Sequence, residues 1–166
     1  MKPMNNNDGP GPRIPFDGNL GGRPIQSDLN HATRSFFDMY WKHDFGKPPA
    51  WIDLEWAFNG SIPNHDKQGC YAILQEGEIV YIVSGIGKGG GSYLNHGLGY
   101  RLKRYFKVNK ERLTGVSQYV PTDPFKGITG ILTIGFDNHY WLAAALEIYL
   151  INQLHPVLNR NHRALL

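Results

Sequence analysis

One stretch decides the fold: residues 69–84, with the sequence GCYAILQEGEIVYIVS. Two apolar runs, 70–74 and 79–84, are rich in β-branched and aromatic side chains and flank a short polar segment that contains a glycine. This pattern predicts two antiparallel strands joined by a tight turn. We therefore expect the sheet to be built outward from this hairpin.

The chain that follows the hairpin predicts one more strand between two helices. Residues 85–91 carry five glycines and are expected to form a loop. The spacing of apolar residues predicts a helix over 98–108 and a strand over 128–136. Asp137 or Asn138 can cap a last helix that runs to His155. Together these elements predict the α+β type of α/β protein, with a small three-stranded mixed or antiparallel sheet flanked by helices.

The chain that precedes the hairpin divides into a tail and a helical extension. Residues 1–26 are rich in Gly, Pro and Asn, which predicts a flexible tail. A helix is expected over 27–43, capped by Ser27 or Asp28, and a second short helix over 50–58. We expect three parts: the tail, an N-terminal helical extension over 27–66, and a core over 67–166.

Length and composition exclude several classes of protein. A chain of 166 residues can bury a core without disulfides or a structural metal. The single cysteine, Cys70, excludes a disulfide framework and a cysteine-based zinc site, and is expected to be an inert packed thiol. The chain has no signal segment and no apolar stretch long enough to span a bilayer. The expectation is a soluble cytoplasmic protein with no membrane partner.

The charges are distributed unevenly, although the formal net charge is only +3. Residues 98–112 hold six bases and one acid, whereas residues 27–66 hold six acids and three bases. A basic stripe beside an acidic segment favours binding of a polyanion such as DNA, with a solvated helix face as the alternative. The expected DNA-binding residues are Lys103, Arg104, Lys107, Lys110, Arg112 and Arg160.

Glu147 is the only charge in the apolar run of residues 140–151. We expect this last helix to be buried on most sides, and an unpaired buried carboxylate costs several kcal/mol. Glu147 therefore needs a cation, a set of strong donors, or a proton, and Mg²⁺ is one such cation. Two alternatives remain: Glu147 lies on a solvent-exposed edge of the helix, or it forms a structural ion pair with an arginine.

Tyr71, Tyr81 and Arg101 are the other candidates for chemistry. Hydrolysis of a phosphodiester needs an oriented water, a cation for the developing negative charge and a metal on the phosphate oxygens. These residues and Glu147 can fill those roles, but tyrosine is also an ordinary strand residue and Arg101 an ordinary surface residue. Taken separately, they do not establish a site.

The order of these residues resembles the GIY-YIG nuclease family. Gly69-Cys70-Tyr71 stands where the family has its first motif, and Tyr81-Ile82-Val83 where it has the second. Residues 98–106, LGYRLKRYF, are similar to the segment with the family's catalytic arginine. Leu146-Glu147, and then Pro156-Val157-Leu158-Asn159, look like the metal-binding glutamate helix and its terminal asparagine. The resemblance covers about residues 69–159, and five short motifs occur in the family's order.

The resemblance implies a DNA endonuclease that uses one divalent metal, Mg²⁺ or Mn²⁺, held by Glu147. Tyr71 would activate the attacking water with help from Tyr81, and Arg101 would steady the phosphate. The remaining implied site residues are Tyr105, in the family's Tyr/His position, and Asn159, which would hold the other site residues in position.

The sequence departs from the family pattern at three places. Cys70 replaces an isoleucine, and Val83 replaces the glycine of the second motif. The position after that motif, often lysine in compact members, is Ser84, and the longer link to Arg101 carries Lys88. We expect Lys88 to substitute for the family lysine.

Restriction-type cleavage of duplex DNA at specific sequences is the leading expectation. The N-terminal extension, with Trp41, Trp51 and Trp56, looks like an addition for choosing DNA, and a homodimer would explain cleavage of both strands. The alternatives are a repair, homing or phage-defence nuclease on single-stranded or branched DNA, or a non-catalytic DNA-binding module. A dinucleotide site at Gly85-Ile86-Gly87-Lys88-Gly89-Gly90 is disfavoured, because no acidic residue follows at the expected distance.

Overall fold

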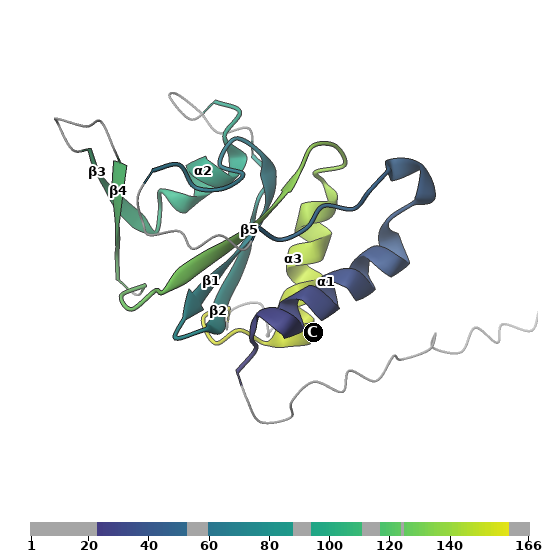
Figure 1. Cartoon of the computed structure of the whole chain (residues 1–166), viewed down its shortest axis with the longest axis horizontal. Coiled ribbons are helices and arrows are strands. Elements are labelled where there is room, and N and C mark those ends of the chain that lie inside the picture. Colours follow the sequence, from purple (N-terminus) through teal and green to yellow (C-terminus); the bar gives the residue numbers. More distant parts are fainter. Residues whose placement is uncertain (1–22, 53–59, 88–93, 111–116, 124, 160–166) are drawn as a thin grey trace, which may run out of the picture.

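The computed structural model describes residues 23–52, 60–87, 94–110, 117–123 and 125–159. The side chains of Val108, Lys110 and Ser117 are also outside this description. The elements of the described chain (Figure 1) are, in order, α1 (Gln26–Tyr40), the 3₁₀ helix η1 (His43–Phe45), β1 (Gln68–Gln75), β2 (Glu78–Gly85), α2 (Gly97–Leu102), β3 (Phe106–Lys110), β4 (Ser117–Pro121), β5 (Gly130–Phe136) and α3 (Leu142–Leu154).

The central sheet has the strand order β2-β1-β5, and both pairings are antiparallel. This confirms the expected α+β class with a three-stranded sheet. The register of β1 on β2 shifts between Ile73 and Leu74, which leaves Val80 as an extra residue. A bulge of this kind breaks the alternation of side chains. As a result, both Val80 and Tyr81 lie on the face of the sheet that packs against α2.

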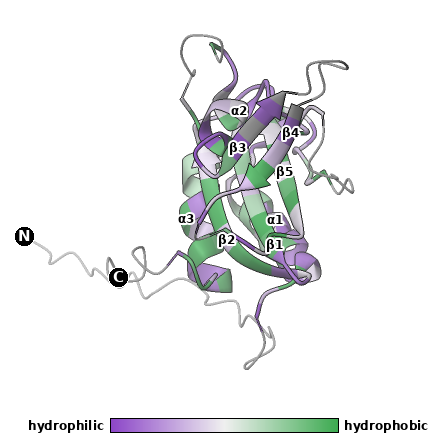
Figure 2. Ribbon diagram, turned by 90° about the vertical axis from the view of Figure 1, so that its left-hand side faces the viewer, coloured by the Kyte–Doolittle hydropathy of each residue, from purple (hydrophilic) through white to green (hydrophobic). Residues whose placement is uncertain are grey.

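Helices cover both faces of this sheet. α1 and α3 pack on one face, and α2 lies over the other (Figure 1). The cluster beneath α1 and α3 contains Phe36, Cys70, Ile82 and Leu146, all almost fully buried. Figure 2 shows that the strands between the helices are predominantly apolar, as strands covered on both faces must be. No helix of the described chain is long and apolar enough to cross a membrane.

The N-terminal extension differs from the sequence prediction at its helix ends. α1 starts at Gln26, so Ser27 and Asp28 lie inside the helix and do not precede it. Asp28 still caps it, because its carboxylate accepts a hydrogen bond of 3.0 Å from the backbone N–H of Ile25. The helix ends at Tyr40 instead of residue 43.

Two segments predicted as tail and helix add backbone pairing to the sheet. Ile25, expected in the flexible tail, forms a bridge with Glu78 at the start of β2. Ile52, expected in a second helix, donates its N–H to the carbonyl of Thr133 at 2.8 Å and lies along β5. The prediction of a helix is therefore wrong at Ile52, and the rest of that prediction falls largely on residues 53–59, outside the described chain.

The predicted helix over 98–108 is wrong beyond Leu102. The chain turns after α2, and Phe106–Lys110 forms β3, which pairs with β4. Leu98, Leu102, Tyr105 and Phe106 have helical spacing, but Phe106 is buried and Lys107 exposed, which is the alternation of a strand. Pairing with the next strand, β4, decided the outcome, and the apolar spacing within 98–108 cannot show such a partner.

The last helix is shorter and more exposed to solvent than the sequence predicted. α3 starts at Leu142 with Trp141 as its N-cap, so neither Asp137 nor Asn138 caps it. Trp141 and Ile148 are 57% and 58% exposed, which contradicts the expectation of burial on most sides. Glu147 nevertheless lies on the half-buried part of the helix.

A substitution at Gly69 tests the packing of β1 against β5. A Cβ atom added there would collide with the carbonyl oxygen of Ile134 in the paired strand. We expect Gly69→Ala to lower the free energy of unfolding by about 3 kcal/mol, measured by guanidinium denaturation. Gly130→Ala is the matched control, because its Cβ would lie 3.9 Å from the Cβ of Leu74 and should change stability by less than about 1 kcal/mol. Equal effects of the two substitutions would contradict the described pairing.

Candidate functional site

Three tyrosines gather on the α2 side of the sheet. Tyr71 on β1 is completely buried, and Tyr81 on β2 is half-buried. Tyr105, just before β3, brings its ring centre within 5.9 Å of Tyr71 and 5.7 Å of Tyr81. The hydroxyls of Tyr81 and Tyr105 are 3.4 Å apart, a long hydrogen bond. Thus residues that are 34 positions apart in the sequence (71 to 105) form one phenolic cluster.

Arg101 on α2 lies within electrostatic reach of this cluster and of Glu147. Burial alone would lower the pKa of Arg101, but the neighbouring phenols of Tyr105, Tyr71 and Tyr81, together with Glu147, outweigh it and raise the pKa. The guanidinium is therefore a fixed positive charge facing neutral phenols and one carboxylate.

Burial holds two of the phenols in their protonated form. Loss of solvent raises the pKa of Tyr71 well above its ordinary value, with Tyr105 and Tyr81 adding to the shift and Arg101 opposing it. Loss of solvent and the hydrogen bond with Tyr105 likewise raise the pKa of Tyr81. At neutral pH these hydroxyls are consequently hydrogen-bond donors, and neither is a strong base.

Two polar atoms of the site are buried without a partner in the described chain: the hydroxyl of Tyr71 and Nε of Arg101. A buried donor without an acceptor costs about 1–3 kcal/mol. Both atoms can donate to an oxygen, and a phosphate ester offers such oxygens. Both atoms are closed off from solvent, so they are buried donors of the site that the described chain leaves unsatisfied.

Glu147 approaches the cluster from α3, and Ser84 on β2 fixes its orientation. The Ser84 hydroxyl donates to Oε2 of Glu147 at 2.5 Å. Glu147 also makes a small contribution to the raised pKa of Tyr81, after the larger effects of burial and of Tyr105. Ser84 was not predicted as the partner of Glu147. The available signal was the position of Ser84, two residues after Ile82 on the same strand. This spacing places both side chains on the face that α3 covers.

Asn159 lies behind the site and holds β2 in place. It is 2% exposed, and its side chain pairs with both backbone groups of Ile82: Oδ1 accepts from the N–H at 2.8 Å, and Nδ2 donates to the carbonyl at 2.7 Å. The N–H of Leu158 also donates to the carbonyl of Val80 at 2.9 Å. Asn159 thus acts on the backbone of the strand that carries Tyr81 and Ser84.

The expected DNA-binding residues have different placements. Lys103, Arg104 and Lys107 are exposed, and the ammonium of Lys103 lies 4.0 Å from the ring centre of Tyr100. The remaining predictions fall outside the described residues or side chains: Lys88, Lys110, Arg112 and Arg160. The expected substitution of Lys88 for the family lysine therefore stays a prediction.

The candidate metal ligand of the site is a single carboxylate. In the described part of the chain, no three His, Cys, Asp or Glu side chains come together. Glu147 offers one carboxylate, and Ser84 engages only its Oε2. Mg²⁺ is commonly held by one or two carboxylates with waters and substrate phosphates. Glu147 would be the protein ligand.

Comparison with protein-family models, curated proteins and solved structures found no match to this chain.

Replacing Tyr71 by phenylalanine tests its raised pKa. Because the folded state favours the neutral phenol, the stabilisation is complete below pH 10, the ordinary pKa, and is lost as the pH rises above it. Wild-type stability should therefore fall above pH 10, with a contribution from Tyr71 that approaches about 1.4 kcal/mol per pH unit. Urea denaturation between pH 8 and 11 should show a shallower fall for Tyr71→Phe.

The same variant has an internal control at neutral pH. Since the Tyr71 hydroxyl has no partner in the described chain, its removal should leave stability at pH 7 unchanged or slightly higher. A large loss at pH 7, or an alkaline profile identical to wild type, would contradict the description of this hydroxyl.

Proposed function

We propose that this protein is a GIY-YIG-type endonuclease that uses Mg²⁺ or Mn²⁺ to hydrolyse phosphodiester bonds of duplex DNA at preferred sequences. The observation that carries the proposal is the cluster of Tyr71, Tyr81 and Tyr105. Arg101 and Glu147 lie close enough to this cluster to act on the pKa of Tyr81. The short motifs in family order include all five of these residues.

Arg101 supplies the positive charge that phosphodiester hydrolysis requires. The transition state concentrates negative charge on the phosphate oxygens, and a preorganised guanidinium stabilises that charge without reorganisation. The buried Nε of Arg101 and the hydroxyl of Tyr71 are donors with no partner in the described chain. Arg101 as a whole is partly exposed, and it is the residue that we propose to contact the scissile phosphate.

The protonation state of the phenols revises the role expected for Tyr71. With their pKa values raised, Tyr71 and Tyr81 hold their protons at neutral pH. In the proposed reaction they orient a phosphate oxygen or the attacking water by hydrogen bonds. The water oxygen bonds to phosphorus, the bond from phosphorus to the leaving sugar oxygen breaks, and the proton of the water passes to that oxygen or to solvent. A divalent cation, when bound, polarises the phosphate and lowers the pKa of a coordinated water. The hydrogen bond from Ser84 orients the Glu147 carboxylate, which would hold that cation.

A single site of this kind cuts one strand at a time. We therefore include a homodimer in the proposal, because two copies related by a two-fold axis match the symmetry of duplex DNA. The activity is proposed to take place in the cytoplasm.

Glu147→Gln is the most direct test of the proposed activity. Glutamine can still accept the Ser84 hydroxyl, so folding should be preserved, but the charge that holds the cation is removed. We expect the rate of plasmid cleavage in Mg²⁺ to fall by at least about 10³-fold, as for removal of a catalytic electrostatic group. Affinity for uncleaved DNA in EDTA should stay within about three-fold of wild type.

Asp38→Asn is the matched control, because Asp38 is an exposed acid on α1 away from the cluster, and it should cleave as wild type does. Wild-type protein that binds duplex DNA but never cuts it would replace the proposal with a non-catalytic DNA-binding module. Full activity of Glu147→Gln would remove Glu147 from the site.

The exposed bases beside Arg101 are expected to bind the DNA backbone. Lys103 and Arg104 follow α2 directly and are both exposed. Replacing both by alanine should weaken binding to all duplexes and reduce the salt dependence of log K by about 2, because each phosphate that is no longer neutralised changes the slope by roughly 0.9. Fluorescence anisotropy across salt concentrations measures this slope, with Lys126→Ala as an exposed control. An unchanged slope would show that these bases do not face phosphates.

A further inference from the structure

β3 and β4 form a two-stranded antiparallel ribbon that is separate from the central sheet. Figure 1 shows the ribbon standing beside the body of the protein, beyond α2. In the register of the pair, Lys107 lies opposite Val120, and Asn109 lies opposite Gln118. Directly opposed residues point to the same side of a ribbon. These four side chains therefore share one face, which we call the outer face.

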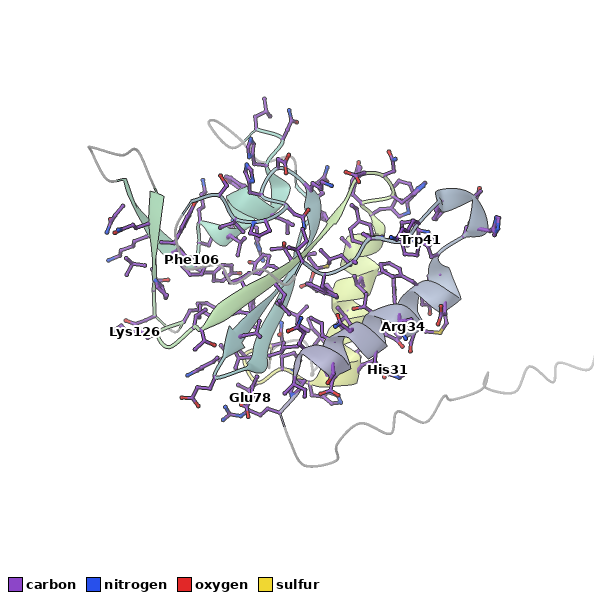
Figure 3. All side chains as sticks on the ribbon, in the orientation of Figure 1. His31, Arg34, Trp41, Glu78, Phe106 and Lys126 are labelled. Atoms are coloured by element: carbon purple, nitrogen blue, oxygen red, sulfur yellow. The ribbon has the colours of Figure 1, made fainter. Side chains whose placement is uncertain are left out.

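The opposite face packs against the protein. Phe106 is 3% exposed, belongs to the apolar cluster under α2 and lies with its ring centre 6.3 Å from that of Tyr119. Figure 3 shows Phe106 at the ribbon, on the side of the body. All four residues of the outer face are exposed to solvent, including Val120 at 46%. The ribbon is thus anchored on one side and presents the other side to solvent.

The outer face has the chemistry of a base-reading surface. Asparagine and glutamine make paired hydrogen bonds with adenine, lysine donates to guanine, and an apolar side chain packs on the methyl group of thymine. The outer face contains one each of Lys, Asn, Gln and Val, with no acid among them. An antiparallel ribbon also has the width that the major groove of B-DNA admits.

The ribbon starts at the candidate site itself. Tyr105 directly precedes β3, and Thr122 directly follows β4. The N–H and the hydroxyl of Thr122 both donate to the carbonyl of Tyr105, at 2.9 and 3.0 Å, and so join the two strands at the base of the ribbon. Asn109 is four residues further along the chain than Tyr105, a distance of roughly 13 Å in a strand. That length corresponds to about four base pairs of duplex.

We propose that the outer face of the β3–β4 ribbon enters the major groove beside the cut and reads the bases there, with Asn109 and Gln118 as the main specificity-determining residues. This inference rests on the proposed function, because it assigns the sequence preference of the same nuclease to one element. It replaces the expectation that Lys107 lies on a helix facing phosphates.

The test compares cleavage preferences of two double variants. Wild type, Asn109→Ala/Gln118→Ala and the control Asn30→Ala/Asn138→Ala, which removes two exposed amides elsewhere, digest a large defined DNA in Mg²⁺. Sequencing of the ends gives the base preference around each cut. The ribbon variant should lose roughly 5- to 150-fold of discrimination at one or more positions, as expected when a pair of hydrogen bonds to a base is removed. These positions should lie within about six base pairs of the cut, given the strand length and the reach of a side chain.

The control variant should keep the wild-type preference, and all three proteins should have the same thermal midpoint. An unchanged preference in the ribbon variant would overturn the inference while leaving the proposed nuclease intact. Absence of cleavage by wild type would instead overturn the proposed function.

A binding experiment tests the ribbon even without cleavage and without a variant of the ribbon. Glu147→Gln protein in EDTA selects duplexes from a randomised pool, and the selected duplex is then prepared with glucosylated hydroxymethylcytosine, which fills the major groove. We expect at least ten-fold weaker binding to the modified duplex than to the unmodified one. Addition of the minor-groove ligand distamycin to the unmodified duplex should cause no such weakening. The inference would be overturned if distamycin weakened binding and the glucosylated base did not, or if the pool yielded no preferred sequence.

Discussion

The two hydrogen bonds between Asn159 and Ile82 fix the strand on which the candidate site depends. β2 has a sheet neighbour on one side only, so its other edge would expose backbone groups that need partners. The Asn159 side chain supplies both partners in a buried position. Tyr81 and Ser84 flank Ile82 along the strand, and their positions follow from this pairing. A residue near the C-terminus thereby sets the geometry of groups that meet Arg101 and Glu147.

The candidate site contains polar groups whose burial costs free energy. The partnerless hydroxyl of Tyr71 and the buried Nε of Arg101 each cost free energy in the folded protein, and the fold supports them through two apolar clusters. The same burial raises the pKa of Tyr71, so this phenol keeps its proton at neutral pH and is a poor proton acceptor.

The sequence predicted the parts of the fold that local pattern determines. The hairpin of β1 and β2 was predicted because two apolar runs and the turn between them occupy one short stretch, and the positions of Tyr71 and Tyr81 followed from it. The β3–β4 ribbon was missed because helical spacing continued past Leu102, whereas the strand that pairs with β3 begins only at Ser117. The partner of Glu147 was missed for the same reason: the hydrogen bond with Ser84 joins residues 63 positions apart.

Backbone pairing on both outer strands also limits how copies of this protein can associate. Ile52 bridges to Thr133 on β5, while Ile25 and Asn159 occupy parts of the edge of β2. An edge strand with satisfied backbone groups is a poor template for adding a strand from another molecule. Self-association through a continuous intermolecular sheet is therefore disfavoured along these stretches, as is amyloid-like stacking. A two-fold assembly would have to use side-chain surfaces, such as the exposed Trp141 and Ile148 of the α3 region.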